Sequence, residues 1–301
     1  MIGVVAHDAG SAEIISSYIR QNNLTCNYSL AGPAIKTFSL KLGPLTNMSL
    51  EELVVNSDKL LCGTSLTAHH EWEAIAKAKK LGKHSTAVID HWTNYRERFV
   101  RDGVWHFPDE VWVGDETAQK LAIDLLPELK VTYVENAYFI DQKKELKKLS
   151  LNKKEKTPGT KILYVTTPMR AGGQKLYNNP LHWGYTEEDA LRYFLSNVNC
   201  LSNNILSIDI RTHPKEEINK YDWAYSEYDL PLSTTRQQSL MEQIVECDVV
   251  AGCATMAMVV GLLAEKRVVS CIPQGGRIKP LPHQEIEKMH ELLEQRINTN
   301  T

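Results

Sequence analysis

The sequence lacks the features of membrane-embedded, secreted and disulfide-built proteins. No run of about 18 uninterrupted apolar residues occurs in its 301 residues, and charge enters at position 8 without a basic leader, which argues against a spanning helix and a signal peptide. No C-x-x-C pair occurs among the six cysteines, so reduced, mostly buried thiols are expected rather than a disulfide framework. These cysteines are Cys26, Cys62, Cys200, Cys247, Cys253 and Cys271.

Excess charge of one sign is also missing. The net charge is −3, so there is no general electrostatic footprint for nucleic acid. With 43% hydrophobic and 24% charged residues the composition is that of a globular protein, and the length suits two domains. The sequence therefore predicts a soluble, cytoplasmic protein with a substantial core.

Short apolar runs alternate with helical patterns in both halves of the chain. The expected strands are 2–6, 60–62, 85–89, 110–113, 161–166, 205–211, 248–252 and 267–272, and the expected helices are 12–20, 71–81, 117–125, 187–198, 237–247, 255–264 and 283–296. Such alternation favours parallel sheets covered by helices on both faces. We predict an α/β protein of two Rossmann-like domains, with their sheets facing a central cleft.

A lysine-rich stretch separates the halves. Residues 143–156 carry seven lysines and two glutamates and are followed by Pro158-Gly159. The prediction is a domain over residues 1–141, a linker over 142–160 and a second domain over 161–301. A solvated linker or polar helix end is the first interpretation. Contact with anionic lipid at the inner face of a membrane, as a peripheral association, is the second.

Polar residues follow the first strand, where ligands of open parallel sheets bind. Gly10 permits a tight turn, and the next helix N-terminus can meet an anion or a hydroxyl-rich ligand. His7 or Asp8 could take a proton from an attacking hydroxyl. The alternative is that Asp8 merely caps the helix through its side chain.

Two further strands of the first half end in candidate acceptor-binding or sugar-binding residues. They are Thr64 and Ser65 after the strand expected over 60–62, and Asp90, His91, Trp92, Arg96 and Arg98 after the strand expected over 85–89. Aromatic rings stack on sugars, and arginine binds carboxylates or phosphates. Helix capping and core packing are the alternatives. Adjacent His69 and His70 point in different directions on a helix, so no metal site is predicted.

The second half carries three candidates for a phosphate site. The first is Arg170 beside the pair Gly172-Gly173, which could form a phosphate-cradling turn. The second is Arg211, His213, Pro214 and Lys215, a strand end where a protonated histidine could stabilise a leaving phosphate. The third is Cys253, Ala254 and Thr255, which open an apolar helix.

These motifs resemble glycosyltransferases of the two-Rossmann-domain (GT-B) type. The segment RTHP followed by CDVVAGCATMAMVVGLLAEKRVVS is similar to the nucleotide-binding half of bacterial sialyltransferases and capsule Kdo transferases. The resemblance implies that His213 and Pro214 are the His-Pro motif and that Thr255 occupies the hydroxyl turn holding the phosphate of a CMP-sugar. Cys253-Ala254 stands where serine or threonine is commoner.

The resemblance also implies a mechanism: a metal-independent, inverting transfer of a sugar such as Kdo or sialic acid to a glycan acceptor in surface polysaccharide synthesis. Asp8 is the predicted base, with His7 or Asp90 as alternatives, and no cofactor is expected. The expected partners are a nucleotide-sugar donor and a glycan acceptor. Two other functions stay open: a UDP-sugar 2-epimerase or hydrolase, and a non-catalytic binding subunit. Neither the oligomeric state nor the nucleotide follows from the sequence.

Overall fold

The computed structural model describes residues 1–151 and 158–299. The chain divides into two compact units, Met1–Asp141 (unit 1) and Gln142–Thr301 (unit 2). Each unit is built around one sheet of six parallel strands. The prediction of two parallel-sheet α/β domains is therefore confirmed, whereas the cleft between them stays a prediction.

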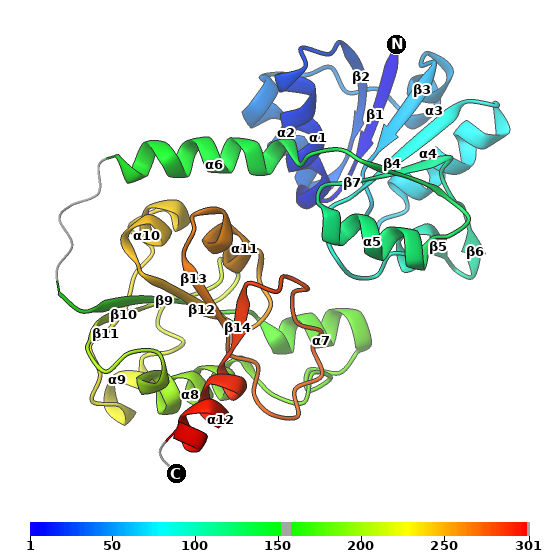
Figure 1. The fold of residues 1–301 in the computed structure, drawn as a ribbon. Coiled ribbons are helices and arrows are strands. Elements are labelled where there is room, and N and C mark those ends of the chain that lie inside the picture. Colours follow the sequence, from blue (N-terminus) through cyan, green and yellow to red (C-terminus); the bar gives the residue numbers. More distant parts are fainter. Residues whose placement is uncertain (152–157, 300–301) are drawn as a thin grey trace. The chain divides into compact units, whose positions relative to one another are not determined.

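Unit 1 has the strand order β2-β1-β3-β4-β7-β8. Helices α1 and α2 pack together on one side of this sheet, and α3 and α4 on the other (Figure 1). Its elements are β1 (Ile2–Ala6), α1 (Ala9–Gln21), β2 (Cys26–Leu30), α2 (Gly32–Leu42), α3 (Leu50–Val55), β3 (Lys59–Cys62), α4 (His70–Lys80), β4 (His84–Ile89), η1 (Glu97–Phe99), β5 (Val100–Arg101), β6 (Val104–Trp105), β7 (Glu110–Val113), α5 (Glu116–Leu125) and β8 (Lys130–Tyr133). Strands β5 and β6 form a separate antiparallel hairpin.

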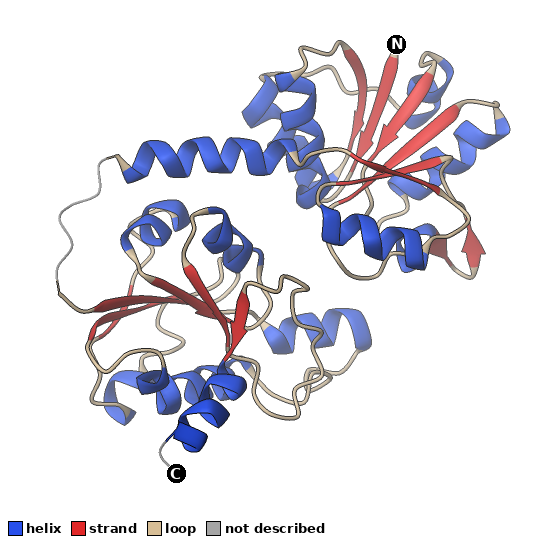
Figure 2. Ribbon diagram, viewed as in Figure 1, coloured by secondary structure: helices blue, strands red, loops and turns tan. Residues whose placement is uncertain are grey.

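Unit 2 has the strand order β11-β10-β9-β12-β13-β14, which is the order of a Rossmann sheet. Figure 2 shows its strands as an inner layer between helices. Its elements are β9 (Thr160–Val165), α7 (Met169–Tyr177), α8 (Glu187–Asn197), η2 (Val198–Cys200), β10 (Ile205–Arg211), α9 (Trp223–Glu227), β11 (Leu232–Thr234), α10 (Leu240–Glu246), β12 (Val249–Gly252), α11 (Met256–Leu263), β13 (Arg267–Ser270), β14 (Ile286–Lys288) and α12 (Met289–Thr299).

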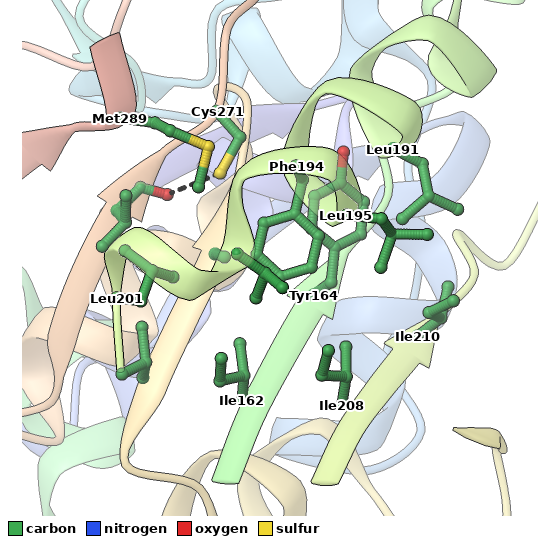
Figure 3. Packing of buried hydrophobic residues seen from close by; sticks show 14 of the residues in the cluster. Ile162, Tyr164, Leu191, Phe194, Leu195, Leu201, Ile208, Ile210, Cys271 and Met289 are labelled. Carbon is green, nitrogen blue, oxygen red and sulfur yellow. Dashed lines mark hydrogen bonds between the residues drawn. The ribbon is translucent and has the colours of Figure 1, made fainter. Parts of the chain in front are cut away.

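The central strands form because their apolar residues are buried on both faces. In β12 all four residues are buried, as expected of a parallel strand between two helical layers. On one face of the unit 2 sheet, Ile162, Tyr164 and Ile208 pack against Phe194 of α8 (Figure 3). The rings of Tyr164 and Phe194 lie 4.7 Å apart. This packing holds the carboxyl ends of β9 and β10 in fixed positions.

Three helices start at a capping box that can be read in the sequence. The N-caps are Ser49, Thr186 and Ser239, each paired with an acid three residues later. The hydroxyl accepts a hydrogen bond from the third backbone N–H, and the acid accepts one from the cap residue, so two otherwise unpaired donors are satisfied.

Some expected elements differ from the structure. The predicted linker is helical as far as Ser150, because α6 runs over Ala137–Ser150, and residues 152–157 lie outside the described part. The helix expected over 283–296 begins instead with the edge strand β14 and becomes helical only at Met289. No helix within residues 1–151 and 158–299 is long and apolar enough to cross a bilayer.

Candidate functional site

Each sheet has one switch point, where the chain leaves two neighbouring strands in opposite directions. It lies between β1 and β3 in unit 1 and between β9 and β12 in unit 2. Sheets of this kind bind ligands outside the carboxyl ends of the strands at that point. His7 and Asp8 follow β1 directly, and Thr255 follows β12.

His7 and Asp8 form a hydrogen-bonded pair. The His7 Nδ1 atom lies 2.7 Å from Asp8 Oδ1, and the two side chains are 31% and 41% exposed. Asp8 stands at the N-cap of α1, but its side chain makes no capping hydrogen bond. The capping alternative is therefore wrong, and the carboxyl is engaged with an imidazole in a place that solvent reaches. A carboxyl–imidazole pair of this kind can accept and pass on a proton.

Glu71 is a third titratable group at this switch point, and no pattern in the sequence marks it as a site residue. It lies in the first turn of α4 and is 3% exposed. Its Oε1 atom accepts a hydrogen bond from the His7 backbone N–H at 2.8 Å. Burial raises the pKa of the Glu71 carboxyl, and the nearby Asp8 adds to this effect.

Asp90 reaches the same place from the carboxyl end of β4, and Arg98 holds it. One Arg98 nitrogen, Nη1, donates to Asp90 Oδ1 at 2.8 Å and to both oxygens of Thr64, at 2.8 and 2.9 Å. The other Asp90 oxygen lies against Gly10, where a Cβ atom would come within 1.9 Å of it. Any side chain at position 10 would therefore displace Asp90.

Three carboxyl groups thus surround the first turn of α1: Asp8, Glu71 and Asp90. Asp90 is paired with Arg98, so the negative charge that a phosphate would meet here comes mainly from Asp8, whereas a hydroxyl group would find hydrogen-bond acceptors. Of the two ligand types expected from the sequence, anion or hydroxyl-rich, the structure favours the hydroxyl-rich one.

The predicted acceptor surface is wrong for several of its members, because their polar atoms are used inside unit 1. Thr64 and Arg98 are buried and bonded to one another. Ser65 is 1% exposed and accepts from the backbone of the following turn, and Trp92 donates from Nε1 to Asp115 at 2.9 Å. Of the predicted set, only Asp90 belongs to the cluster of three carboxyl side chains around the first turn of α1.

The two remaining acceptor candidates, Arg96 and His91, contact neighbouring side chains of unit 1. Arg96 pairs with Glu128 at 2.6 Å and lies over the ring of Trp105, 5.6 Å from its centroid. The Nδ1 atom of His91 lies 3.1 Å from the Thr93 hydroxyl.

Gly32 shapes the surroundings of His7 and provides a test of them. It has φ +51°, and a Cβ atom there would lie 2.6 Å from His7 Nε2. We expect Gly32→Ala to displace the His7 ring, which nuclear magnetic resonance of the imidazole would detect, and to lower the free energy of unfolding by about 1–2 kcal/mol from its left-handed backbone.

The matched control is Gly43→Ala, since Gly43 has φ +82° and nothing within 4 Å of a Cβ. It should lose similar stability but leave the His7 signals unchanged. Identical His7 spectra in both variants would contradict the contact.

In unit 2 the His-Pro segment forms a turn held by Glu216. The Glu216 carboxylate accepts from the His213 backbone N–H at 3.1 Å, from Lys220 Nζ at 2.7 Å and from the Tyr221 hydroxyl at 2.8 Å. It also accepts from the Thr166 hydroxyl. Burial alone would raise the pKa of Glu216, but these hydrogen bonds outweigh it and the pKa is lowered.

The contacts of the His213 ring favour its neutral form, with Nε2 as the donor, over the protonated form considered from the sequence. Its Nδ1 atom accepts from the Lys215 backbone N–H at 3.2 Å, so the ring proton of the neutral form lies on Nε2. Burial lowers the pKa of His213, and the charges of Lys215 and Arg236 lower it further, against an opposing effect of Glu216. At neutral pH the ring can donate one hydrogen bond from Nε2.

Arg236 was missed in the sequence and belongs to this turn. It donates to the His213 carbonyl and to the Thr212 hydroxyl, both at 2.7 Å. Arg211 lies nearby, since its pKa is lowered by burial and by the charge of Arg236, and its Nη1 atom donates to the Gln238 carbonyl at 2.9 Å. With Lys215, these residues place three cationic side chains around the His213 turn against the carboxylate of Glu216, and this excess of positive charge suits a phosphate.

The glycine pair does not form the expected phosphate-cradling turn. Gly172 and Gly173 lie inside helix α7, and a Cβ at Gly173 would come within 2.5 Å of the Asn179 carbonyl. The Arg170 guanidinium is held by Glu187 and Glu188. The expectation of a loop is wrong because both glycines are helical, and Gly173 allows close packing of α7 against the segment that follows it.

The segment after β12 is divided between core and surface. Cys253 is buried, its Sγ lies 3.8 Å from the Cys271 carbonyl, and burial raises the pKa of its thiol to about 11. The Cys253 thiol is therefore part of the core. Ala254 and Thr255 are half-buried, and the Thr255 hydroxyl accepts from Ala257 N at 3.4 Å as the N-cap of α11.

A pocket of about 460 Å³ opens in unit 2 beyond β13 and β14. Its walls combine apolar side chains with the turn Pro273–Gly276, in which Gly276 N donates to the Pro273 carbonyl at 3.0 Å. This volume is in the range of small-molecule sites. Within the described residues no three His, Cys, Asp or Glu side chains converge as metal ligands.

Comparison with solved structures defines the fold. The chain superimposes on a UDP-GlcNAc 2-epimerase from Neisseria meningitidis bound to UDP-GlcNAc with a TM-score of 0.59 and 10% identity, covering 99% of this chain and 90% of that one. For the glycotransferase of kitacinnamycin the TM-score is 0.52 with 11% identity, covering 93% and 81%. The fold is GT-B-like. No protein-family model and no curated protein matches the sequence.

A third similar structure is an α/β-galactoside α-2,3-sialyltransferase from Photobacterium phosphoreum, with a TM-score of 0.49 and 8% identity, covering 97% of this chain and 98% of that one. At this score the likeness supports no conclusion about the present chain. The resemblance to GT-B proteins is therefore confirmed for the fold, and the CMP-sugar group within it stays a prediction.

Proposed function

We propose that this chain is an enzyme that acts on a UDP-activated sugar and breaks the bond between the anomeric carbon and the nucleotide, in the manner of a 2-epimerase or hydrolase. The observation that carries the proposal is the contrast between two switch points on a GT-B-like fold. In unit 1, carboxyl groups around His7 suit a sugar hydroxyl. In unit 2, a basic turn around His213 suits a phosphate.

The reaction needs stabilisation of the leaving phosphate and, for epimerisation, a base, and these residues can supply both. When the carbon–oxygen bond breaks, its electron pair stays on the nucleotide phosphate, and the His213 Nε2–H with Lys215 and Arg236 would stabilise that charge. In 2-epimerisation a base also takes the proton from the neighbouring sugar carbon, and proton and nucleotide then add back with the proton on the opposite face. Asp8 with His7 would be that base.

UDP is favoured over CMP because the epimerase with a TM-score of 0.59 is bound to UDP-GlcNAc. Transfer of the sugar to a glycan acceptor is the second candidate, favoured by the likeness to the kitacinnamycin glycotransferase. In that reaction the same base would take its proton from the acceptor hydroxyl. The catalytic roles of Asp8, His7 and His213, and donor contacts of Arg211, Pro214, Ala254 and Thr255, are part of this proposal.

The experiment is incubation with UDP-GlcNAc or a CMP-sugar in D₂O, followed by nuclear magnetic resonance of the sugar. Deuterium at the carbon next to the anomeric carbon would support epimerisation, and free UDP with an unchanged sugar would support hydrolysis. Product that forms only with an added glycan would support transfer. Binding of no nucleotide in a thermal-shift panel of UDP, CDP, CMP and GDP would overturn the proposal and favour a non-catalytic subunit.

His213→Ala is expected to weaken UDP binding by about 10- to 100-fold, since one hydrogen bond to a charged phosphate is lost. The thermal shift at saturating UDP, worth about 2.7 kcal/mol at 100 times the dissociation constant, should fall accordingly. His84→Ala is the control, because His84 is a half-exposed histidine of unit 1. An undiminished shift in His213→Ala would remove this residue from the site.

A further inference from the structure

Glu71 is a buried acid that contacts His7, and the proposed reaction gives it no role. It is separated from His7 by 64 positions in the chain, yet its carboxyl is the acceptor for the His7 backbone N–H. Buried carboxyl groups are costly unless their oxygens are paired. Here the second oxygen, Oε2, has no hydrogen-bond partner among the described residues, so stability alone does not account for a carboxyl at this position.

The residues around Glu71 leave space for its carboxyl group. Gly63 lies against it, and a Cβ at position 63 would come within 3.2 Å of Glu71 Oε1 and 2.4 Å of the Ser11 hydroxyl. The charged or titratable groups that influence it are Asp8, His70, Arg101 and Cys62. Arg101 is not its hydrogen-bond partner, because Arg101 donates to the carbonyls of Ser65 and Ala68.

We propose that Glu71 is a positioning residue of the His7–Asp8 pair. By holding the His7 backbone N–H, it keeps the imidazole in the place where Nδ1 meets Asp8. The inference deepens the proposed function and rests on it for its catalytic consequence. A group acting through another in this way affects catalysis by geometry, and small displacements of reacting groups cost large factors in rate.

The experiment compares four variants. Glu71→Ala removes the acceptor, Glu71→Gln keeps a side-chain oxygen without the charge, and Glu71→Asp keeps the charge but withdraws it by one carbon–carbon bond. Glu73→Gln is the matched control, since Glu73 is an exposed acid of the same helix. Hydrogen exchange of the His7 amide and the kcat and KM for UDP-GlcNAc are measured for each.

Glu71→Ala and Glu71→Asp are expected to lose protection of the His7 amide and to lower kcat on the order of 10- to 100-fold, with KM changed by about twofold or less because the proposed nucleotide contacts are in unit 2. Glu71→Gln should retain the protection and most of kcat. Unchanged amide protection or unchanged kcat in Glu71→Ala would overturn the inference. If that variant does not fold, Glu71→Asp decides in the same way.

The two proposals fail separately. If the wild-type chain turns over no nucleotide sugar, the proposed function fails, while amide exchange still shows whether Glu71 holds His7. The pH dependence adds a further readout. Because burial raises the pKa of Glu71, the stability gained by keeping this carboxyl neutral is fully present below its unfolded pKa and is lost as pH rises through its folded pKa. Glu71→Gln should therefore resist urea better than wild type at pH ~7.5 and equally at pH ~4.

Discussion

Asp8→Asn is expected to lower turnover of the nucleotide sugar by about 10²–10⁴-fold, the usual contribution of a general base. The asparagine preserves the size of the side chain and its place at the N-cap of α1, but it cannot take up a proton. Nucleotide binding should be unchanged, because the predicted phosphate contacts lie at the His213 turn. Steady-state kinetics and a UDP titration of the same preparation measure both effects.

Asp124→Asn is the control for this experiment, since Asp124 is an exposed acid on α5. Asp90→Asn tests the alternative base. Because Asp90 is bound to Arg98 at 2.8 Å, its loss should first appear as lower stability of unit 1. If Asp90→Asn abolishes turnover without destabilisation while Asp8→Asn leaves it intact, the assignment of the base to Asp8 is refuted.

Arg98→Ala is expected to destabilise unit 1 by about 3–5 kcal/mol, the cost of leaving a buried charge without its partner. The side chains of Arg98 and Asp90 are 5% and 16% exposed, and the same guanidinium also holds both oxygens of Thr64. Urea unfolding of the full chain, followed by nuclear magnetic resonance signals of residues in unit 1, measures the loss.

Arg96→Ala is the matched control, two positions away. Its partner is Glu128, and the two side chains are 43% and 38% exposed, so the expected loss is at most about 1 kcal/mol. Equal effects of the two substitutions would contradict the assignment of Arg98 to the interior. The comparison separates the structural arginine of the D-H-W-T-N-Y-R-E-R segment from the surface one, which the sequence does not distinguish.

The strands predicted from continuous apolar runs were correct, because such runs directly reflect burial of the strand. Runs such as 2–6, 110–113 and 205–211 are strands with the expected bounds, since apolar residues between two helical layers need no polar alternation. The strand Cys26–Leu30 was missed, because it is an edge strand of the unit 1 sheet, paired there only with β1, and carries the polar residues Asn27 and Ser29. Short edge strands such as β14 produce equally little periodicity.

The sites show the same division between local and long-range information. His7, Asp8 and His213 could be selected because each follows an apolar strand, and strand ends are where such sheets bind ligands. Gly172 and Gly173 were misinterpreted, because a glycine pair is compatible with both a loop and a closely packed helix. The partners Glu71 and Arg236 carry no local signal, because the groups they hold are 64 and 23 positions away.

The sequence by itself therefore determined the class of fold, two parallel α/β units, and the strand ends at which chemistry is to be sought, since both follow from hydrophobic periodicity. Only the tertiary structure decided which polar side chains at those ends are used internally and which remain available. Arg98, Thr64 and Cys253 fall in the first class, and the His7–Asp8 pair and the Nε2–H of His213 in the second. The reason is physical: hydrogen bonds and burial are settled between segments far apart in the chain, which periodicity does not record.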